Sequence, residues 1–336
     1  MLPAKESLHE RAFRGGKGLP RRQRNAALSG VAALNKPLVN MAASVRRLLN
    51  LARERKEDFG LVLTKYGLER VLYRIAQSKH RDTFVLKGAL LFELWTKQRY
   101  RPTRDADFLA RGQNSLERFV AIFKEICEMD VEDDGLRFDS ATVVAERITE
   151  DADYEGIRVK LIGYLEHARV PIQIDLGFGD VITPAPVETE IPSLLDLPNA
   201  KLLTYPRETV VAEKFEAMVS LGLANSRMKD FYDVRSLSRD FPFEGASLSE
   251  AIKQTFGRRD TQLLSGMPLV FISEFFDDAD KKKQWAASCN KNRGYVPETS
   301  LESVCKEIEA FLMPLVEALN GKAALPQKWS NGSWEN

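Results

Sequence analysis

The sequence predicts an α/β protein in which a mixed sheet flanked by helices is joined to a C-terminal helical half. Short apolar runs near residues 84–86, 106–110 and 170–178 have the length of strands. Apolar residues at helical spacing surround these runs, and a proline-containing passage separates them from a purely helical pattern. The chain has 336 residues, of which 44% are hydrophobic, so one large or two ordinary domains can form a core.

The first half of the chain alternates helices and strands. Residues 44–76 carry apolar side chains at helical spacing with a polar break, which predicts two helices. Residues 84–86 form the next strand, and a tight turn at Lys87-Gly88-Ala89 opens a buried helix. The apolar run of residues 106–110 predicts a short strand, and the helical spacing of apolar residues in 116–129 predicts a further helix.

A β-hairpin is expected after that helix. Residues 157–165 and 170–178 both have strand patterns, and residues 166–169 connect them. In the second strand the apolar residues of the even positions share one face, so Asp175 lies on the other face.

We predict four segments along the chain. A basic leader occupies 1–40, a sheet domain 41–190, a helical domain 191–325 and a tail 326–336. The leader contains eight basic and two acidic residues, and it is either a mobile basic arm or a leader without functional role. In the helical domain, residues 209–222 and 226–238 have helical patterns.

Composition excludes several classes of function. The formal net charge is +1, so a polyanion could be bound only by local basic clusters. The three cysteines lack a Cys-x-x-Cys spacing and the three histidines are scattered, which disfavours zinc sites and Ser-His or Cys-His nucleophiles. No secretory signal or membrane-spanning run is visible, so we expect a cytoplasmic protein with no membrane partner.

Carboxylates are the strongest candidates for chemistry. Asp105 and Asp107 are two residues apart on a predicted strand, so their side chains project to the same face. If the hairpin pairs beside this strand, Asp175 adds a third carboxylate at the same place. Three such groups suit hard cations such as Mg²⁺, as in two-metal phosphoryl-transfer sites. The alternative is that Asp175 only lies on the solvated face of an amphipathic strand.

Two charged residues interrupt apolar helix faces in the second half. Lys214 lies in the apolar stripe of 209–222, and Asp230 lies in that of 226–238. A buried charge is costly unless it is paired, so each should contact an opposite charge. Two interpretations remain open: a structural Lys214–Asp230 salt bridge, or contact of Lys214 with a phosphate.

Taken in order, these residues resemble the AbiEii/AbiGii toxin family of nucleotidyltransferases. The resemblance spans about residues 44–238 and leaves out the leader. It is carried by five matched stretches: Phe84-Val85-Leu86-Lys87-Gly88-Ala89-Leu90, Arg101-Pro102-Thr103-Arg104-Asp105-Ala106-Asp107, Ile174-Asp175-Leu176, Ala212-Glu213-Lys214 and Lys229-Asp230-Phe231-Tyr232-Asp233-Val234.

The resemblance implies a polymerase-beta-type nucleotidyltransferase domain and a role for each matched residue. Asp105, Asp107 and Asp175 would hold the metal. Lys214 would contact the triphosphate, and Asp230, or alternatively Asp233, would be the last catalytic acid. The nucleotide-binding residues would be Lys87, Gly88, Ala89, Thr103, Arg104 and Lys214.

Ala89 stands where family members commonly have Gly or Ser, so a hydroxyl that could bind a phosphate is lost. An insertion over residues 90–104 also separates this turn from Asp105. The grip on phosphate would therefore depend on backbone N–H groups and on Lys87, Arg101 or Arg104.

The resemblance also implies an activity and its partners. We expect Mg²⁺ or Mn²⁺ as cofactor, an NTP as substrate, an RNA acceptor such as the 3′ end of tRNA, as for MenT-type relatives, and a cognate antitoxin in a phage-defence system. Two alternatives remain: a nucleotide- or antitoxin-binding module without turnover, and a transferase that modifies protein hydroxyls. The sequence leaves the NTP, the acceptor and the oligomeric state open.

Overall fold

The structure is a computed structural model that describes residues 41–96, 100–151, 154–263, 265–296 and 299–335. The predicted basic leader, residues 1–40, lies outside the described residues.

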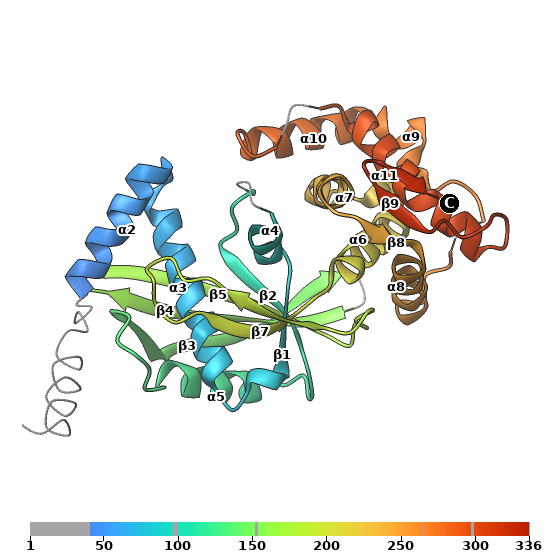
Figure 1. The fold of residues 1–336 in the computed structure, drawn as a ribbon. Helices are drawn as coiled ribbons and strands as arrows, with labels where there is room; N and C mark the ends of the chain where they lie inside the picture. The colour runs from blue at the N-terminus through green and yellow to red at the C-terminus, as the bar shows by residue number, and fades with distance from the viewer. Residues whose placement is uncertain (1–40, 97–99, 152–153, 264, 297–298, 336) are drawn as a thin grey trace, which may run out of the picture. The chain divides into compact units, whose positions relative to one another are not determined.

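A seven-stranded mixed sheet forms the centre of the fold (Figure 1). Its strand order is β3-β4-β5-β2-β1-β7-β6, and the β2–β5 and β1–β7 pairs are parallel whereas the other pairs are antiparallel. The strands are β1 (Phe84–Lys87), β2 (Asp105–Ala110), β3 (Leu136–Asp151), β4 (Tyr154–Leu165), β5 (Ala168–Phe178), β6 (Val187–Ile191) and β7 (Ala200–Thr204).

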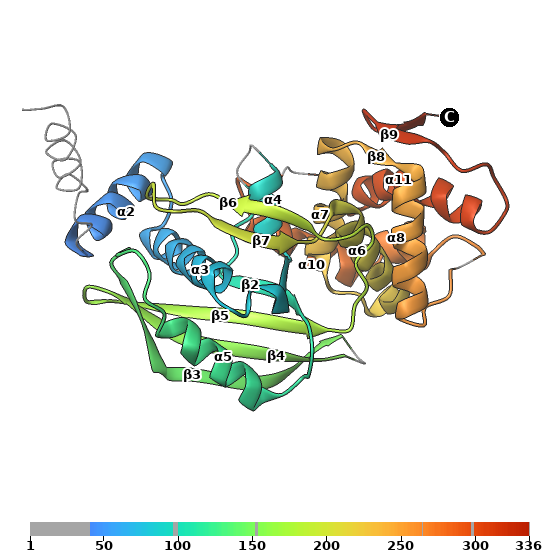
Figure 2. The same ribbon diagram turned by 60° about the horizontal axis from the view of Figure 1, so that its bottom comes forward.

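Helices α3 and α5 lie on the same side of this sheet (Figure 2). Gly67 of α3 lets the helix approach β5, since an added Cβ would meet Ile172 and Val170 at 2.7 Å. Phe119 and Phe123 of α5 pack edge-on against Phe84 of β1. The helices of this half are α2 (Met41–Arg55), α3 (Phe59–Gln77), α4 (Leu90–Trp95) and α5 (Leu116–Cys127), with a 3-10 turn at Arg81–Thr83.

The second half is built from helices and a small sheet. The helices are α6 (Arg207–Leu221), α7 (Met228–Asp240), α8 (Gly245–Arg258), α9 (Ser273–Phe276), α10 (Ala279–Lys291) and α11 (Leu301–Leu319), with 3-10 turns at Gly222–Ala224 and Leu269–Phe271. Strands β8 (Phe243–Glu244), β9 (Lys328–Ser330) and β10 (Ser333–Glu335) form a three-stranded sheet. The indole N–H of Trp329, which is buried, donates to the Ser238 carbonyl at 2.6 Å.

The predicted fold class is confirmed: the protein is mixed α/β, with helices flanking the sheet and a set of C-terminal helices. The domain boundaries stay a prediction, although the central sheet extends beyond residue 190 to Thr204 and the segment predicted as a tail contains β9 and β10. Among the described helices, none is both long and apolar enough to cross a membrane.

Register determines which side chains meet at the centre of the sheet. Lys87 of β1 lies opposite Asp107, and Asp107 lies beside Asp175 of β5. The predicted hairpin of β4 and β5 is present, but its connection is shorter than expected. Leu165 pairs directly with Ala168, so only two residues form the turn, and Glu166 adopts a positive φ of 52°.

Candidate active site

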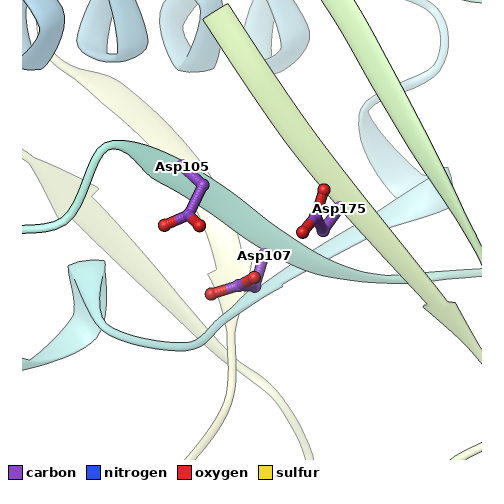
Figure 3. A group of neighbouring side chains, drawn as sticks. All are labelled: Asp105, Asp107 and Asp175. Atoms are coloured by element: carbon purple, nitrogen blue, oxygen red, sulfur yellow. The ribbon is translucent and has the colours of Figure 1, made fainter. Parts of the chain in front are cut away.

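Three carboxylates converge where β2 and β5 pair. Asp105 and Asp107 project from the same face of β2, and Asp175 projects toward them from β5 (Figure 3). One oxygen atom from each carboxylate lies within 4.8 Å of the other two. The Thr103 hydroxyl donates a hydrogen bond to Asp105 Oδ1. The sequence pattern therefore predicted correctly that the three acids come together.

The turn after β1 brings backbone close to these acids. Gly88 has a φ of 78°, a conformation that residues with a Cβ rarely adopt. A Cβ on Gly88 would lie only 1.9 Å from Asp107 Oδ2. Glycine is thus required at this position for two reasons, conformation and close approach. The short helix α4 begins directly after Ala89.

Arg158 of β4 holds the third carboxylate, and the sequence analysis missed it. Its Nε donates to Asp175 Oδ1 at 2.8 Å and its Nη2 donates to Oδ2 at 2.7 Å. These hydrogen bonds raise the pKa of the Arg158 guanidinium. Arg158 lies directly opposite Asp175 across the β4–β5 pair. The two-residue hairpin turn sets this register, so a correct turn length would have identified Arg158.

Two cationic side chains from the helical half, Lys214 and Arg227, line the same cavity as the three carboxylates and are here called the cationic wall. Lys214 of α6 donates a hydrogen bond to Asp230 Oδ1 and lies 3.0 Å from Asp233 Oδ2. Burial alone would lower the pKa of Lys214, but the two carboxylates outweigh it and raise the pKa. Arg227 Nε lies 2.8 Å from Asp230 Oδ2. The predicted contact of Lys214 with Asp230 is therefore present.

Asp233 lies deeper than Asp230 and is completely buried. Arg101 donates to both of its oxygens at 3.0 and 2.7 Å, and the Tyr100 hydroxyl donates to Oδ1 at 2.6 Å. Burial alone would raise the pKa of Asp233, but Lys214, Arg101 and Tyr100 hold it well below its ordinary value. Asp230 lines the cavity and Asp233 does not, which separates the two acids that the sequence left as alternatives.

A second charged cluster lies beside Lys87. Lys87 Nζ is 3.6 Å from Asp180 Oδ2, and Arg259 Nη2 is 3.1 Å from Asp180 Oδ1. Arg259 also contacts the Glu216 carboxylate at 2.8 Å. Burial raises the pKa of Glu213 to about 7, although Lys87 and Arg259 oppose this effect. Glu213 can therefore change its charge near neutral pH, a property that its position beside Lys214 in the sequence did not reveal.

These groups line one cavity with a volume of about 350 Å³. It contains most of the predicted site residues: Lys87, Gly88, Ala89, Thr103, Asp105, Asp107, Asp175, Lys214 and Asp230. Further lining residues not assigned a role from sequence include Arg227, Lys229, Glu213 and Arg259. Arg104, the remaining residue predicted to bind the nucleotide, does not line this cavity but a separate groove. Arg104 lies at a bend directly before β2, so the alternation of side chains along the strand does not place it beside Asp105.

The triad suits a divalent cation. Carboxylate oxygens are the donors that Mg²⁺ and Mn²⁺ prefer, and the spacing allows one ion to contact all three side chains. Without such an ion, three carboxylates within this distance would repel one another, with Arg158 as a cationic partner of Asp175. The donor set thus fits the cofactor class expected from the sequence.

One protein family and two solved structures are similar to this chain. The sequence model of the family described as "Nucleotidyl transferase AbiEii toxin, Type IV TA system" matches residues 70–313. Among solved structures, the "Crystal structure of putative nucleotidyltransferase from H. pylori" is similar, with 14% identity, a TM-score of 0.41, and coverage of 77% of this chain and 96% of that chain. JHP933 from Helicobacter pylori is also similar, with 15% identity, a TM-score of 0.36, and coverage of 76% and 94%. No curated protein matches the chain.

The family match covers most of the chain, including every residue of the triad, the Gly88 turn and the cationic wall. Membership implies a nucleotide substrate and an antitoxin. The chain belongs to the AbiEii nucleotidyltransferase toxin family of type IV toxin–antitoxin systems.

Proposed function

We propose that this protein is a Mg²⁺-dependent nucleotidyltransferase toxin that adds a nucleotide from an NTP to the 3′ end of an RNA, with tRNA as the expected acceptor. The observation that carries the proposal is the polarity of the cavity. Its sheet side presents three carboxylates, and its helical side presents the cations Lys214, Arg227 and Lys229 beside the acids Glu213 and Asp230. A metal-bound triphosphate has the matching polarity, with cations on one side and phosphate oxygens on the other.

Asp105, Asp107 and Asp175 would hold the metal, which when bound neutralises charge on the reacting phosphate. The Gly88-Ala89 backbone would lie against the phosphates, because the tight turn brings main chain beside Asp107. Lys214 would neutralise charge that develops on the leaving pyrophosphate, while Asp230 and Asp233 hold its ammonium group in place.

In the proposed reaction the acceptor hydroxyl oxygen bonds to the α-phosphorus, and the bond from that phosphorus to the pyrophosphate oxygen breaks. Asp175 would accept the hydroxyl proton. Both of its oxygens already accept hydrogen bonds from Arg158, so this transfer requires that one of those bonds opens. Arg158 is therefore a positioning residue that orients Asp175 before the acceptor arrives.

The test uses the full chain, Mg²⁺, each α-³²P-labelled NTP in turn and total RNA. We expect the wild type to label RNA and Asp105→Asn to lose transfer by about a thousandfold, since one metal ligand is neutralised. Glu317→Gln, at an exposed carboxylate of α11, serves as the matched control and should keep full activity. Equal labelling by Asp105→Asn and wild type would remove Asp105 from the site.

The same experiment separates the acceptors. Label that RNase removes and protease does not supports an RNA acceptor. Label that only protease removes would overturn the RNA assignment in favour of protein hydroxyls, and tight NTP binding without any labelled product would favour a module without turnover.

A further inference from the structure

A groove lies over β3, β4 and β5, beside the strand pairs that carry the triad. Pairing in the sheet places Gln173 of β5 beside Asp105, and Lys160 of β4 opposite Gln173. Strand side chains alternate, so the face that carries Asp175 also carries Lys160 and Tyr164 of β4 and Arg169 of β5. The groove has a volume of about 560 Å³, and Arg104, Lys160, Arg169 and Gln173 are among its lining residues.

The strand residues Lys160, Arg169 and Gln173 do not share the face that packs against α3 and α5, although Thr64 of α3 also lines the groove. Those helices lie on the other side of the sheet (Figure 2), where Val159, Leu161 and Ile174 are almost fully buried. On the groove side, Lys160 and Arg169 are exposed and Val144 is 55% exposed. The strands thus present a solvated surface on the same face of the sheet as Asp175.

The groove face has an excess of positive charge. Away from the triad and its partner Arg158, the cations of this face are Arg104, Arg137, Lys160 and Arg169, and its described carboxylates are Asp139 and Glu146. Arg158 pairs with Asp175, and Lys160 pairs with Glu146 at 2.6 Å between exposed side chains. An exposed pair of this kind contributes little to stability, so a phosphate could replace Glu146 at small cost.

Apolar and aromatic groups lie among these charges. Val144 and Ile162 line the groove, and the guanidinium of Arg137 lies over the Tyr164 ring at 5.2 Å from its centroid. A face that combines cations with an aromatic ring and apolar side chains matches single-stranded RNA, in which phosphates need positive charge and unstacked bases need flat or apolar partners.

From these observations we propose that the groove face of β3–β5 is the binding surface for the single-stranded 3′ end of the acceptor RNA. The strand would run along β5 and place its terminal hydroxyl beside Asp175. The distance along β5 from Arg169 to Asp175 is about 20 Å, which accommodates several nucleotides. This inference rests on the proposed RNA acceptor and assigns it a path that the triad cavity alone does not define.

The first test measures binding without NTP, so that it does not depend on catalysis. Anisotropy of a fluorescein-labelled single-stranded RNA with a free 3′ hydroxyl is recorded over a series of salt concentrations. Lys160→Gln/Arg169→Gln should weaken binding about tenfold, and the slope of log affinity against log salt should decrease by about 1.4, because two phosphate contacts are lost. Lys253→Gln/Lys328→Gln removes two exposed lysines of α8 and β9 and should change neither quantity.

The aromatic part of the surface has a different signature. Tyr164→Leu should weaken RNA binding about tenfold and leave the salt slope unchanged, since stacking does not release counterions. Tyr295→Leu, at a partly exposed tyrosine of the helical half, is the control and should bind like the wild type. Thermal melting of each variant checks that the fold is retained.

The outcomes separate this inference from the proposed function. Suppose that the wild type transfers nothing to RNA, but that the variants at Lys160, Arg169 and Tyr164 bind RNA more weakly than their controls. The proposed reaction is then wrong, and the proposed binding surface is supported. If the wild type labels RNA while these variants bind it like their controls, the reaction stands and the surface is wrong. Failure of the wild type to bind the RNA also overturns the surface.

Discussion

The sheet side and the helical side of the cavity accommodate closely spaced charges in different ways. On the sheet side, short aspartate side chains on rigid strands hold like charges together, with Arg158 paired to Asp175. On the helical side, Lys214 and Arg227 lie beside Asp230 and Asp233, and Arg101 reaches Asp233 from the segment before β2, so each buried charge has an opposite partner. Three like charges at the spacing of the triad favour an added cation on the sheet side, whereas the charges on the helical side are paired with one another and with Arg101. We therefore assign metal binding to the sheet side of the cavity and the positioning of Lys214 to the helical side.

Replacing the most deeply buried acid should have the largest effect. Asp233→Asn leaves Arg101 and Lys214 without their shared carboxylate, and we expect the free energy of unfolding to fall by about 3–5 kcal/mol. Urea denaturation measures the change. Asp230→Asn is the matched variant on the same helix, and it should lose less stability, because Asp230 borders the cavity where water can replace it. Equal losses from both variants would contradict the assignment of Asp233 as structural and Asp230 as part of the site.

Disturbing the sheet side through its backbone should reduce activity more than stability. In Gly88→Ala the added Cβ would displace the Asp107 carboxylate, and we expect nucleotidyl transfer to fall by about a hundredfold. Gly321→Ala is a close control, since Gly321 also has a positive φ of 71° but an added Cβ meets nothing within 4 Å. Both variants carry similar backbone strain. Comparable activity in the two would show that the contact with Asp107 does not matter.

The pH dependence of NTP binding tests the charged cluster beside Lys87, which includes Glu213. Glu213, whose pKa is raised to about 7, is neutral below that pH and negatively charged above it. A new negative charge near the triphosphate should weaken NTP binding about fivefold as the pH rises through 7. Glu213→Gln cannot ionise, so calorimetric titration of both proteins from pH 6 to 8 isolates this effect from the titration of the NTP itself. Parallel profiles for the two proteins would exclude Glu213 as the cause.

The smallest expected effect concerns the phosphate turn. Ala89→Ser restores a hydroxyl at the position where this chain departs from the common family pattern. The new hydrogen bond should tighten NTP binding about fivefold, in line with about 1 kcal/mol for one hydrogen bond. Affinity is compared with that of wild type and of Ala89→Val, which adds bulk without a donor. If serine and valine have the same effect, Ala89 does not face a phosphate.

Local patterns were sufficient to predict most of the fold and the triad. Alternation along β2 and β5 placed Asp105, Asp107 and Asp175 on one face, and helical periodicity identified Lys214 and Asp230 as charges within apolar stripes. These inferences use only the spacing of neighbours in sequence, which the backbone geometry of helices and strands fixes.

The residues that were missed depend on register or on irregular segments. Arg158 meets Asp175 only because the hairpin turn has two residues, whereas the sequence suggested a longer connection. Arg101 and Tyr100 reach Asp233 from a stretch outside regular helix or strand. Such a stretch has no periodic pattern of apolar residues from which the direction of a side chain could be predicted. The long strand β3 also escaped prediction, because polar residues predominate along much of it.

The central claim is that the three carboxylates of β2 and β5 hold the metal of an NTP complex. The most direct measurement is a crystal structure with Mn²⁺ and a non-hydrolysable NTP, collected at a wavelength where manganese scatters anomalously. We predict an anomalous peak between Asp105, Asp107 and Asp175, with the phosphates between that peak and Lys214. A manganese peak elsewhere, or a triphosphate bound away from this cavity, would contradict the account.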